Sequence, residues 1–345
     1  MNTTPSDKNK PERVLVTGGG GFLGDSIVSR LVRRGDHVRS LARNLYPALE
    51  VLGVEQIRGD IGEAPAVDKA CRDVDVVFHV AAKPPPWGKY TDYYQTNVVG
   101  TRNVIDACIQ QQVSRLIYTS TPSVIFNGEN LEGVDESFPY PAKYKAYYPA
   151  TKAEAEQSVV KAAGRGLKTI ILRPHEIWGP GDPHFVPRLL ARAKKLKQIG
   201  DGRNLIDTIY IDNAADAHIL AAEKLKDNPR LSGNIYFISQ GEPMPAWDMI
   251  NAVLKAAGYG PVQGKVPFRV AWLTGAALEF FYKAFRIAGE PQMTRFLAEA
   301  VAVSHWFNID AAKKDLGYQP MVSTREGLKR LAEWLKNNTA IGAAK

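Results

Sequence analysis

The stretch RVLVTGGGGFLG, residues 13–24, decides the fold. The short apolar run at 13–17 has the pattern of a buried strand, and the amphipathic segment 25–34 has that of a helix. Glycines between a strand and a helix let the backbone approach a pyrophosphate, which the free N–H groups and the dipole of the helix N-terminus stabilise. The stretch therefore predicts a dinucleotide site. The glycines fit two registers, Gly19-x-Gly21-x-x-Gly24 and Thr17-Gly18-x-x-Gly21-x-x-Gly24.

Alternating apolar runs and amphipathic segments continue from Arg13 to Pro174. Six runs have strand patterns, near residues 13–17, 37–42, 54–58, 75–80, 115–119 and 168–173. Such alternation predicts an α/β fold with a Rossmann-type, doubly wound parallel sheet that helices cover on both faces. Ligands of these sheets bind at the carboxyl ends of the strands. Thr17, Ala82, Thr121 and Pro174 should therefore lie on one rim.

A second motif, Tyr148-Pro-Ala-Thr-Lys152, lies in a helical segment. Residues four apart share one helix face, so Tyr148 and Lys152 can act together in proton transfer. A phenol has a reference pKa of about 10, and a neighbouring ammonium favours its charged form. The pair therefore predicts proton exchange with a substrate oxygen, the exchange that accompanies hydride transfer. Tyr147 is a weaker candidate, because the residue four positions later is Thr151.

Together the two motifs resemble the extended short-chain dehydrogenase/reductases. Further matches follow in the order that this superfamily shows, at residues 60–61, 78–82, 97–101, 119–124, 172–174 and 178–182. Within the superfamily the chain resembles the 3β-hydroxysteroid dehydrogenase-type group. More narrowly, the amino-acid sequence of residues 173–182 and 207–218 is similar to that of the bacterial 2-alkyl-3-oxoalkanoate reductases of olefin biosynthesis. The resemblance extends from the first strand to the region 316–318.

The resemblance implies two lobes. Residues 13–175 would form the NAD(P)-binding Rossmann domain, to which residues 207–240 return. Residues 176–206 and 241–345 would form a smaller, mostly helical substrate lobe. Residues 1–12 are expected to be a disordered tail, because they are polar and lack an apolar core. A homodimer is also implied, because members of the superfamily often dimerise.

The resemblance also assigns catalytic roles to four residues. The Thr121 hydroxyl would hold the substrate carbonyl while Tyr148 donates the proton. Lys152 would contact the nicotinamide ribose and lower the pKa of Tyr148. Asn97 matches the helix Asn that supports the active-site water and the Lys. The serines at positions 120 and 123 are close enough to Thr121 to remain alternatives for its role.

We expect NADPH to be preferred over NADH. In NAD enzymes an acid at the end of the second strand usually binds the ribose hydroxyls, whereas a basic residue accommodates the 2′-phosphate of NADP. The strand at 37–42 ends without an acid and is followed by Arg43. Asp60 would lie near the adenine. The expected cofactor site comprises Gly18, Gly21, Phe22, Leu23, Gly24, Arg43, Asp60, Ile61, Ala81, Ala82, Tyr148, Lys152 and Pro174.

Two regions indicate a large apolar substrate with an anionic group. His175 follows Pro174 at the predicted rim, where a cationic side chain would face a carboxylate. The segment 266–288 has an apolar face at helical spacing and places Trp272 and Phe280 on or near it. We expect this segment to be a core-facing helix, a lid over the substrate or a peripheral membrane contact. It is too polar to span a bilayer.

The net charge, the cysteine content and the polarity of the first residues make several classes of function less plausible. The net charge of +8 suits anionic ligands or an acidic membrane surface, and no nucleic-acid-binding motif accompanies it. Only Cys71 and Cys108 are present, both in helical patterns, so neither a disulfide framework nor a metal site is expected. The polar first residues do not have the pattern of a signal peptide. We therefore expect a cytoplasmic protein, associated with a membrane only if residues 266–288 make the contact.

These patterns favour an NADP-dependent oxidoreductase that interconverts a ketone and a secondary alcohol on a large apolar small molecule. The favoured reaction is the reduction of a 2-alkyl-3-oxoalkanoate to the 3-hydroxy acid. Three alternatives stay open: a 3β-hydroxysteroid or sterol dehydrogenase, a sugar-nucleotide epimerase or dehydratase, and a dinucleotide-sensing scaffold without turnover. The intact set of Thr121, Tyr148 and Lys152 argues against the scaffold.

Overall fold

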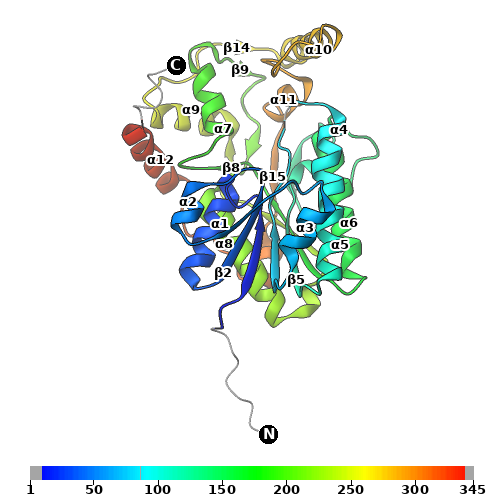
Figure 1. The fold of residues 1–345 in the computed structure, drawn as a ribbon. Helices are drawn as coiled ribbons and strands as arrows, with labels where there is room; N and C mark the ends of the chain where they lie inside the picture. The colour runs from blue at the N-terminus through cyan, green and yellow to red at the C-terminus, as the bar shows by residue number, and fades with distance from the viewer. Residues whose placement is uncertain (1–9, 86, 339–345) are drawn as a thin grey trace.

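The computed structural model of the chain describes residues 10–85 and 87–338 and is built around one seven-stranded sheet (Figure 1). Neighbouring strands are parallel, in the order β12-β7-β5-β4-β1-β2-β3. The predicted doubly wound sheet is thus confirmed, and its order reverses between β1 and β4, where such sheets bind dinucleotides. The strands are β1 (Arg13–Thr17), β2 (His37–Ala42), β3 (Glu55–Arg58), β4 (Val76–His79), β5 (Arg115–Thr119), β7 (Lys168–Pro174) and β12 (Asn234–Ile238).

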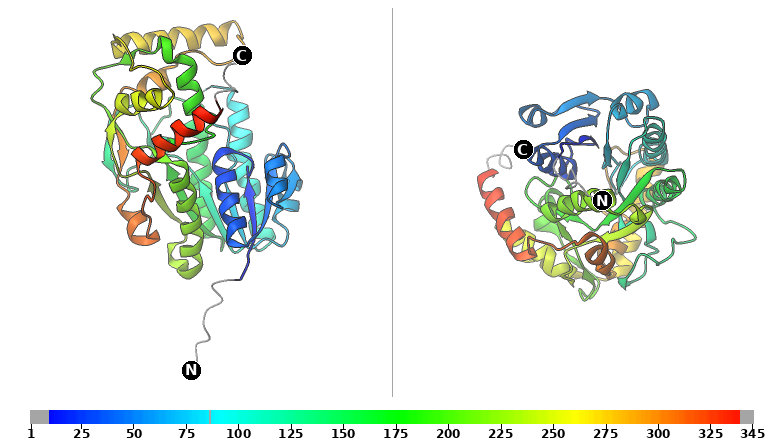
Figure 2. Two further views of the ribbon diagram at one scale, coloured as in Figure 1. Left: turned by 90° about the vertical axis from the view of Figure 1, so that its left-hand side faces the viewer. Right: turned by 90° about the horizontal axis from the view of Figure 1, so that it is seen from below.

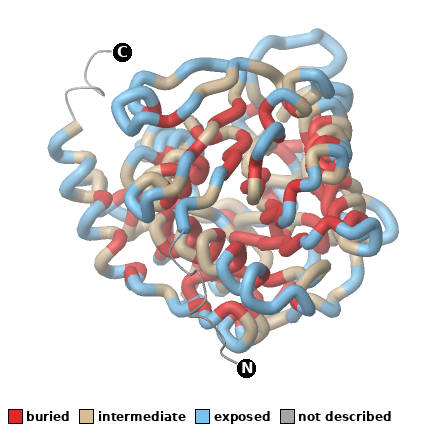
Figure 3. Tube along the Cα trace, turned by 60° about the horizontal axis from the view of Figure 1, so that its bottom comes forward, coloured by how far each residue is buried: buried red, intermediate tan, exposed pale blue. Residues whose placement is uncertain are grey.

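Helices cover both faces of the sheet. On one face lie α1 (Phe22–Arg34) and α8 (Ile211–Asp227), and on the other α3 (Ala64–Cys71), α5 (Gly100–Gln110) and α6 (Tyr147–Ala163). Successive strand residues point to opposite faces, so Val14 and Val16 belong to one hydrophobic core and Leu15 to the other. Because both faces are buried, the strands read as continuous apolar runs. Figure 3 shows buried positions gathered in the interior of the molecule and exposed positions mainly at its periphery.

Most of the remaining elements lie over the carboxyl ends of the strands, at the top of Figure 1. They include a four-stranded sheet of order β13-β10-β15-β6, in which β15 is parallel to both neighbours. Residues 131–134, which the sequence placed in the Rossmann domain, therefore join this second sheet, while α8 and β12 return to the first. The strands of the second sheet are β6 (Leu131–Val134), β10 (Leu205–Ile206), β13 (Met244–Pro245) and β15 (His305–Phe307).

Short elements complete this region. Two small pairings join β8 (Ile177–Trp178) to β11 (Ile209–Tyr210), and β9 (Gln198–Ile199) to β14 (Lys265–Val266). The helices are α2 (Pro47–Val51), α4 (Tyr90–Tyr93), α7 (Phe185–Arg192), α9 (Ala246–Ala256), α10 (Phe268–Ala284), α11 (Arg295–Ala300) and α12 (Thr324–Asn338).

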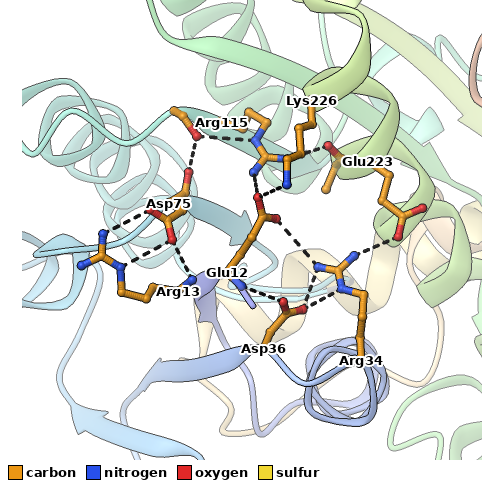
Figure 4. A network of polar contacts seen from close by, with 10 residues as sticks. Glu12, Arg13, Arg34, Asp36, Asp75, Arg115, Glu223 and Lys226 are labelled. Carbon is orange, nitrogen blue, oxygen red and sulfur yellow. Dashed lines mark hydrogen bonds and ion pairs between the residues drawn. The ribbon is translucent and has the colours of Figure 1, made fainter. Parts of the chain in front are cut away.

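The expected tail of residues 1–12 includes at least one residue that belongs to the fold. Residues 1–9 lie outside the described residues, but Glu12 is held in a polar network at the amino-terminal side of the sheet (Figure 4). Its carboxylate accepts from Arg115 at 2.6 Å and from Lys226 at 2.9 Å, which are the first residue of β5 and a residue in the last turn of α8. Burial alone would raise the pKa of Glu12, but these cations lower it overall. Glu12 therefore belongs to the folded domain.

Candidate active site

A cavity of about 530 Å³ opens at the carboxyl ends of β1, β4, β5 and β7. It extends from the glycine loop at one end to a group of aromatic and imidazole side chains at the other. The predicted cofactor residues all line it, as do the predicted catalytic and substrate residues Thr121 and His175. Asn97, Trp272 and Phe280 are the predicted site residues that do not.

The glycine loop has the shape of a phosphate cradle. Gly18 adopts a φ of 73°, which side chains disfavour, and a Cβ at Gly24 would lie 2.1 Å from the Gly18 carbonyl oxygen. Gly18, Gly21 and Gly24 line the cavity and Gly19 does not, which favours the Thr17-Gly18-x-x-Gly21-x-x-Gly24 register. Helix α1 begins at Phe22, so its free N–H groups face the cavity. These residues fit a dinucleotide pyrophosphate.

At the adenosine end, β2 ends at Ala42 and Arg43 lines the cavity with an exposed side chain. The backbone carbonyl of Arg43 accepts from Nε of Arg58 at 3.2 Å, which brings a second guanidinium to this edge. The Asp60 carboxylate accepts from the backbone N–H of Gly62 at 2.8 Å and so holds the loop after β3. The cavity end is therefore basic at the position where an acid binds ribose in NAD enzymes.

The predicted catalytic residues lie after β5 and on α6. Thr121 follows β5 and begins a 3₁₀ turn, where its Oγ1 accepts from the backbone N–H of Ser123 and contacts the Ser123 hydroxyl, both at 3.2 Å. Tyr148 lies in the first turn of α6 and Lys152 one turn later. The Lys152 ammonium is buried, donates to the Thr119 carbonyl at 2.7 Å and lies 4.3 Å from the centre of the Tyr118 ring.

The protonation states differ from the expectation. Burial raises the pKa of Tyr148 to about 12, and a hydrogen bond with Thr121 offsets only part of this. Burial also lowers the pKa of Lys152 to about 7, although the charge of Glu156 favours the ammonium. The expected lowering of the Tyr148 pKa by Lys152 is therefore not found, because the ammonium is turned to the Thr119 carbonyl. A phenol that keeps its proton at neutral pH suits proton donation during ketone reduction.

Asn97 occupies a supporting position outside the cavity. It lies in a π-helical turn, residues 94–99, between α4 and α5. Its side chain accepts from the Lys83 backbone N–H at 2.8 Å and donates to the Thr151 hydroxyl at 3.1 Å. Asn97 therefore joins the loop after β4 to helix α6 at Thr151, the residue that precedes Lys152. It contacts neither Lys152 nor Tyr148 among the described hydrogen bonds.

The substrate end of the cavity combines apolar rings with two imidazoles. Nε2 of His175 lies 3.0 Å from Nδ1 of His305, and Glu176 lines the same space. The apolar lining includes Phe126, Leu131, Ile177, Phe185, Phe296 and Phe307. Sequence reasoning missed both Glu176 and His305. The position of Glu176 directly after His175 could have pointed to it, but His305 reaches the cavity through a three-residue strand with no motif around it.

Trp272 and Phe280 lie on α10, which is not a core-facing helix. Its predicted apolar face is turned outward: Phe280 is 66% exposed and Leu273 61%. The inner face instead carries Glu279, whose carboxylate pairs with Arg295 at 2.7 Å. Trp272 donates to Glu299 at 3.0 Å. The expected substrate contacts of Trp272 and Phe280 are corrected accordingly, because Trp272 packs against the hydrophobic core, Phe280 faces solvent, and neither lines the cavity.

Other polar residues that could suggest function have structural roles. His79 is buried between the Thr17 and Thr101 hydroxyls, at 2.7 and 2.9 Å, and burial lowers its pKa to about 3. Cys71 and Cys108 are both free and buried. Within residues 10–85 and 87–338, no cluster of His, Cys, Asp and Glu could hold a metal ion. Over the same residues, no helix combines the length and the hydropathy that crossing a bilayer requires.

Comparisons with known proteins give the site a context. The model of the 3-beta hydroxysteroid dehydrogenase/isomerase family matches residues 15–268. The chain is 48% identical over 323 residues to the 2-alkyl-3-oxoalkanoate reductase of Stenotrophomonas maltophilia, which covers 92% of this chain and 98% of the relative. It is 33% identical over 337 residues to the decarboxylating sterol-4-alpha-carboxylate 3-dehydrogenase of Homo sapiens, with 95% and 89% covered. The solved UDP-glucuronic acid 4-epimerase of Bacillus cereus in complex with NAD has a TM-score of 0.73 and 25% identity, with 94% and 99% covered.

Replacing Tyr148 with Phe should abolish turnover and leave cofactor binding nearly intact, because only the transferable proton is removed. General acid catalysis is worth about 10²–10⁴-fold, so we expect kcat to fall at least about a hundredfold. Lys152→Ala should weaken both turnover and cofactor binding. Nicotinamide absorbance measures the rate and fluorescence titration the cofactor affinity.

Tyr147→Phe is the matched control for this experiment. Tyr147 is the exposed neighbour of Tyr148 on the same helix, lies outside the cavity lining and should tolerate the change at the wild-type rate. If Tyr148→Phe retained more than roughly a tenth of the wild-type rate, Tyr148 would not be the proton donor.

Proposed function

We propose that this chain, which belongs to the 3-beta hydroxysteroid dehydrogenase/isomerase family, reduces a 2-alkyl-3-oxoalkanoate to the corresponding 3-hydroxy acid with NADPH. The predicted extended short-chain dehydrogenase/reductase class is confirmed by the family match, and the chain is an NAD(P)-dependent oxidoreductase. The observation that carries the proposal is the cavity itself. It places a protonated Tyr148 between a glycine cradle and an apolar end that holds imidazoles.

The geometry supports a separate role in the reaction for each group of residues that line the cavity. When bound on the glycine loop, the nicotinamide cofactor supplies the hydride that reduces the carbonyl carbon. Tyr148 then donates its proton to the carbonyl oxygen, which the Thr121 hydroxyl orients by a hydrogen bond. The phenylalanines at positions 126, 296 and 307 exclude water from the alkyl chains. Every side chain needed for these steps lines the same cavity.

The substrates that appear in the names of these two relatives share one chemical feature. A 2-alkyl-3-oxoalkanoate and a sterol-4-alpha-carboxylate each carry a carboxylate on the carbon next to C3, the carbon that is reduced or oxidised. A cavity for such a substrate needs a subsite for an anion close to the nicotinamide position. His175, which follows Pro174 and lines the cavity, is our candidate for this subsite. A sugar-nucleotide substrate would instead require polar partners where this cavity has phenylalanines.

The proposed preference for NADPH rests on Arg43. No acid stands at the end of β2, and both Arg43 and Arg58 lie at the edge where a 2′-phosphate would sit. A guanidinium binds a phosphate through paired, charge-assisted hydrogen bonds, which a ribose hydroxyl does not offer.

We expect kcat/KM with NADPH to exceed that with NADH, and the double change Ala42→Asp with Arg43→Ser to reverse this preference. The new carboxylate would accept from the ribose hydroxyls and repel the 2′-phosphate. Steady-state assays with both cofactors measure the ratio. Arg33→Ser, on the exposed side of α1, removes one positive charge away from the cavity and serves as the control. Equal use of both cofactors by the wild type would contradict the proposal.

Catalytic efficiency should rise steeply with the length of the alkyl chains. A buried methylene contributes about 0.8 kcal/mol, which corresponds to about fourfold in kcat/KM for each carbon until the cavity is full. A series of 2-alkyl-3-oxoalkanoates of increasing length tests this dependence. A flat profile would argue against the keto acid, and faster turnover of a 3-ketosteroid or a UDP-sugar would select the corresponding alternative.

We further propose that α10 makes a peripheral contact with an anionic membrane surface. The helix runs along the outer edge of the substrate lobe (Figure 2, left), with Leu273 and Phe280 pointing to solvent. Residues 268–289 expose three cations, Arg269, Lys283 and Arg286, and their only carboxylate, Glu279, is buried in its ion pair. A second copy of the chain on this face would bring like charges together, whereas acidic headgroups would complement them.

Vesicles of phosphatidylcholine with phosphatidylserine should bind the protein, and the binding should weaken as salt is added. Changing Leu273 and Phe280 together to Ser should abolish binding without loss of folding, because both side chains are exposed. Val51→Ser, which alters an 88% exposed side chain on α2, is the control. Vesicle flotation measures binding. Unchanged flotation of the double variant, or a dimer that this variant converts to a monomer, would contradict the proposal.

A further inference from the structure

His175 and His305 form a bonded pair at the substrate end of the cavity. Nε2 of His175 lies 3.0 Å from Nδ1 of His305, with the ring planes at 86° to one another. The other two ring nitrogens face backbone carbonyls. Nδ1 of His175 contacts the Asp207 oxygen, and Nε2 of His305 lies 2.6 Å from the Ala300 oxygen. The four ring nitrogens thus make three polar contacts: one between the two rings, and one from each ring to a backbone carbonyl.

Three contacts of this kind need three N–H protons. A carbonyl oxygen only accepts, so each backbone contact requires one N–H on the ring. The two nitrogens that face each other need a third, because two lone pairs at 3.0 Å repel. Two neutral imidazoles carry only two N–H groups between them. A complete set of hydrogen bonds therefore gives the pair one additional proton and one positive charge.

Burial opposes that charge in the absence of a counter-ion. It lowers the pKa of His175 to about 3 and also lowers the pKa of His305. An anion in the cavity restores electrostatic stabilisation that burial removes from an imidazolium. Proton binding and anion binding then strengthen each other by the same factor. The arrangement is therefore expected to be sensitive to the charge of the ligand.

We propose that His175 and His305 together form the subsite for the substrate carboxylate and take up a single shared proton when the anion binds. The inference rests on the proposed reduction of a keto acid and names the residues that distinguish the acid from a neutral ester. The pair acts in specificity, and neither ring suffices alone. Without His305 there is no second nitrogen to share the proton.

Most titratable groups around the pair of imidazoles already form hydrogen bonds or ion pairs with other residues. The Asp182 carboxylate accepts from backbone N–H groups at the start of α7, at 2.7 Å for His184. The Asp207 carboxylate accepts from Ser239 at 2.7 Å, and Glu299 is paired with Lys145 at 3.0 Å. Of the remaining groups, burial keeps Tyr148 protonated and lowers the pKa of His184.

Glu176 and Lys152 are the competitors for the proton. Glu176 is exposed to the open cavity, but the surrounding protein desolvates its carboxyl, and this desolvation together with the charge of Asp182 raises its pKa to about 7. Its carboxyl is neutral below this pH and repels a carboxylate above it. Lys152 also has a pKa of about 7. Binding of an acid should thus weaken as the pH rises through about 7, and variants must identify which group is responsible.

Calorimetric titration with octanoate, in two buffers of different ionisation enthalpy at pH about 6, where Glu176 and Lys152 already hold their protons, counts the protons taken up by the imidazole pair. The protein is saturated with NADP⁺, and octanoate has no keto group, so binding is measured apart from turnover. We expect uptake of a fraction of one proton in the wild type and in Glu176→Gln, because the anion raises the low pKa of the pair only part of the way to this pH. His305→Gln should lose the uptake and bind octanoate about tenfold more weakly, with methyl octanoate unaffected. His37→Gln, at an exposed position on β2, should match the wild type.

The outcomes distinguish failure of the shared-proton site from failure of the proposed keto-acid reduction. Uptake that persists in His305→Gln would place the proton on Glu176 or Lys152 and overturn the shared-proton site, as would a wild type that takes up none. Equal weakening for acid and ester would show that His305 only fills space, and would overturn it too. Octanoate bound with proton uptake, together with failure to reduce any 2-alkyl-3-oxoalkanoate, would retain the site and reject the proposed substrate.

Discussion

The buried ion pair between Arg173 and Glu156 fixes the geometry on which the site depends. The carboxylate accepts from Nη2 and Nε of the guanidinium at 2.6 and 3.0 Å, and both side chains are almost completely shielded from solvent. Arg173 belongs to β7, one residue before the rim of the cavity, and Glu156 lies one turn after Lys152 on α6. The pair therefore holds the helix that carries Tyr148 against the strand that leads to the substrate end. Removing one partner of such a pair leaves an uncompensated buried charge, which typically costs about 3–5 kcal/mol.

The same burial that makes this ion pair strong also sets the proton chemistry of the cavity. It raises the pKa of Tyr148 and lowers that of Lys152, so that both groups favour their neutral forms. Glu156 partly restores the ammonium through its charge, which connects the structural ion pair to the catalytic lysine. A neutral phenol is the form required of a proton donor. Burial therefore keeps Tyr148 in the form that the proposed reduction requires.

The sequence predicted the parts of the protein that depend on local pattern. Strand and helix periodicity from Arg13 to Pro174 located the large sheet, and the four-residue spacing located Tyr148 and Lys152 on one helix face. Patterns of this kind say that a face is apolar but not what covers it, so the orientation of α10 was not predictable. His305 was missed for another reason. It enters the cavity on β15, a short strand whose parallel neighbours β6 and β10 lie about a hundred residues or more earlier, and pairing over such distances has no local signal.

One further departure from regular structure explains why two consecutive residues, His175 and Glu176, can both line the cavity. On a continuous strand, His175 and Glu176 would point to opposite sides. Pairing of β7 with β12 ends at Pro174 opposite Ile238, and Glu176 then adopts a φ of 42°. Such a conformation costs a residue other than glycine about 1 kcal/mol or more, and it persists only where surrounding contacts hold it. Here the Glu176 carbonyl accepts from the backbone N–H of Ile209, while the His175 ring bonds to the Asp207 carbonyl. The strained turn thus directs both an imidazole and a carboxyl into one cavity, where their proton affinities influence the same ligand.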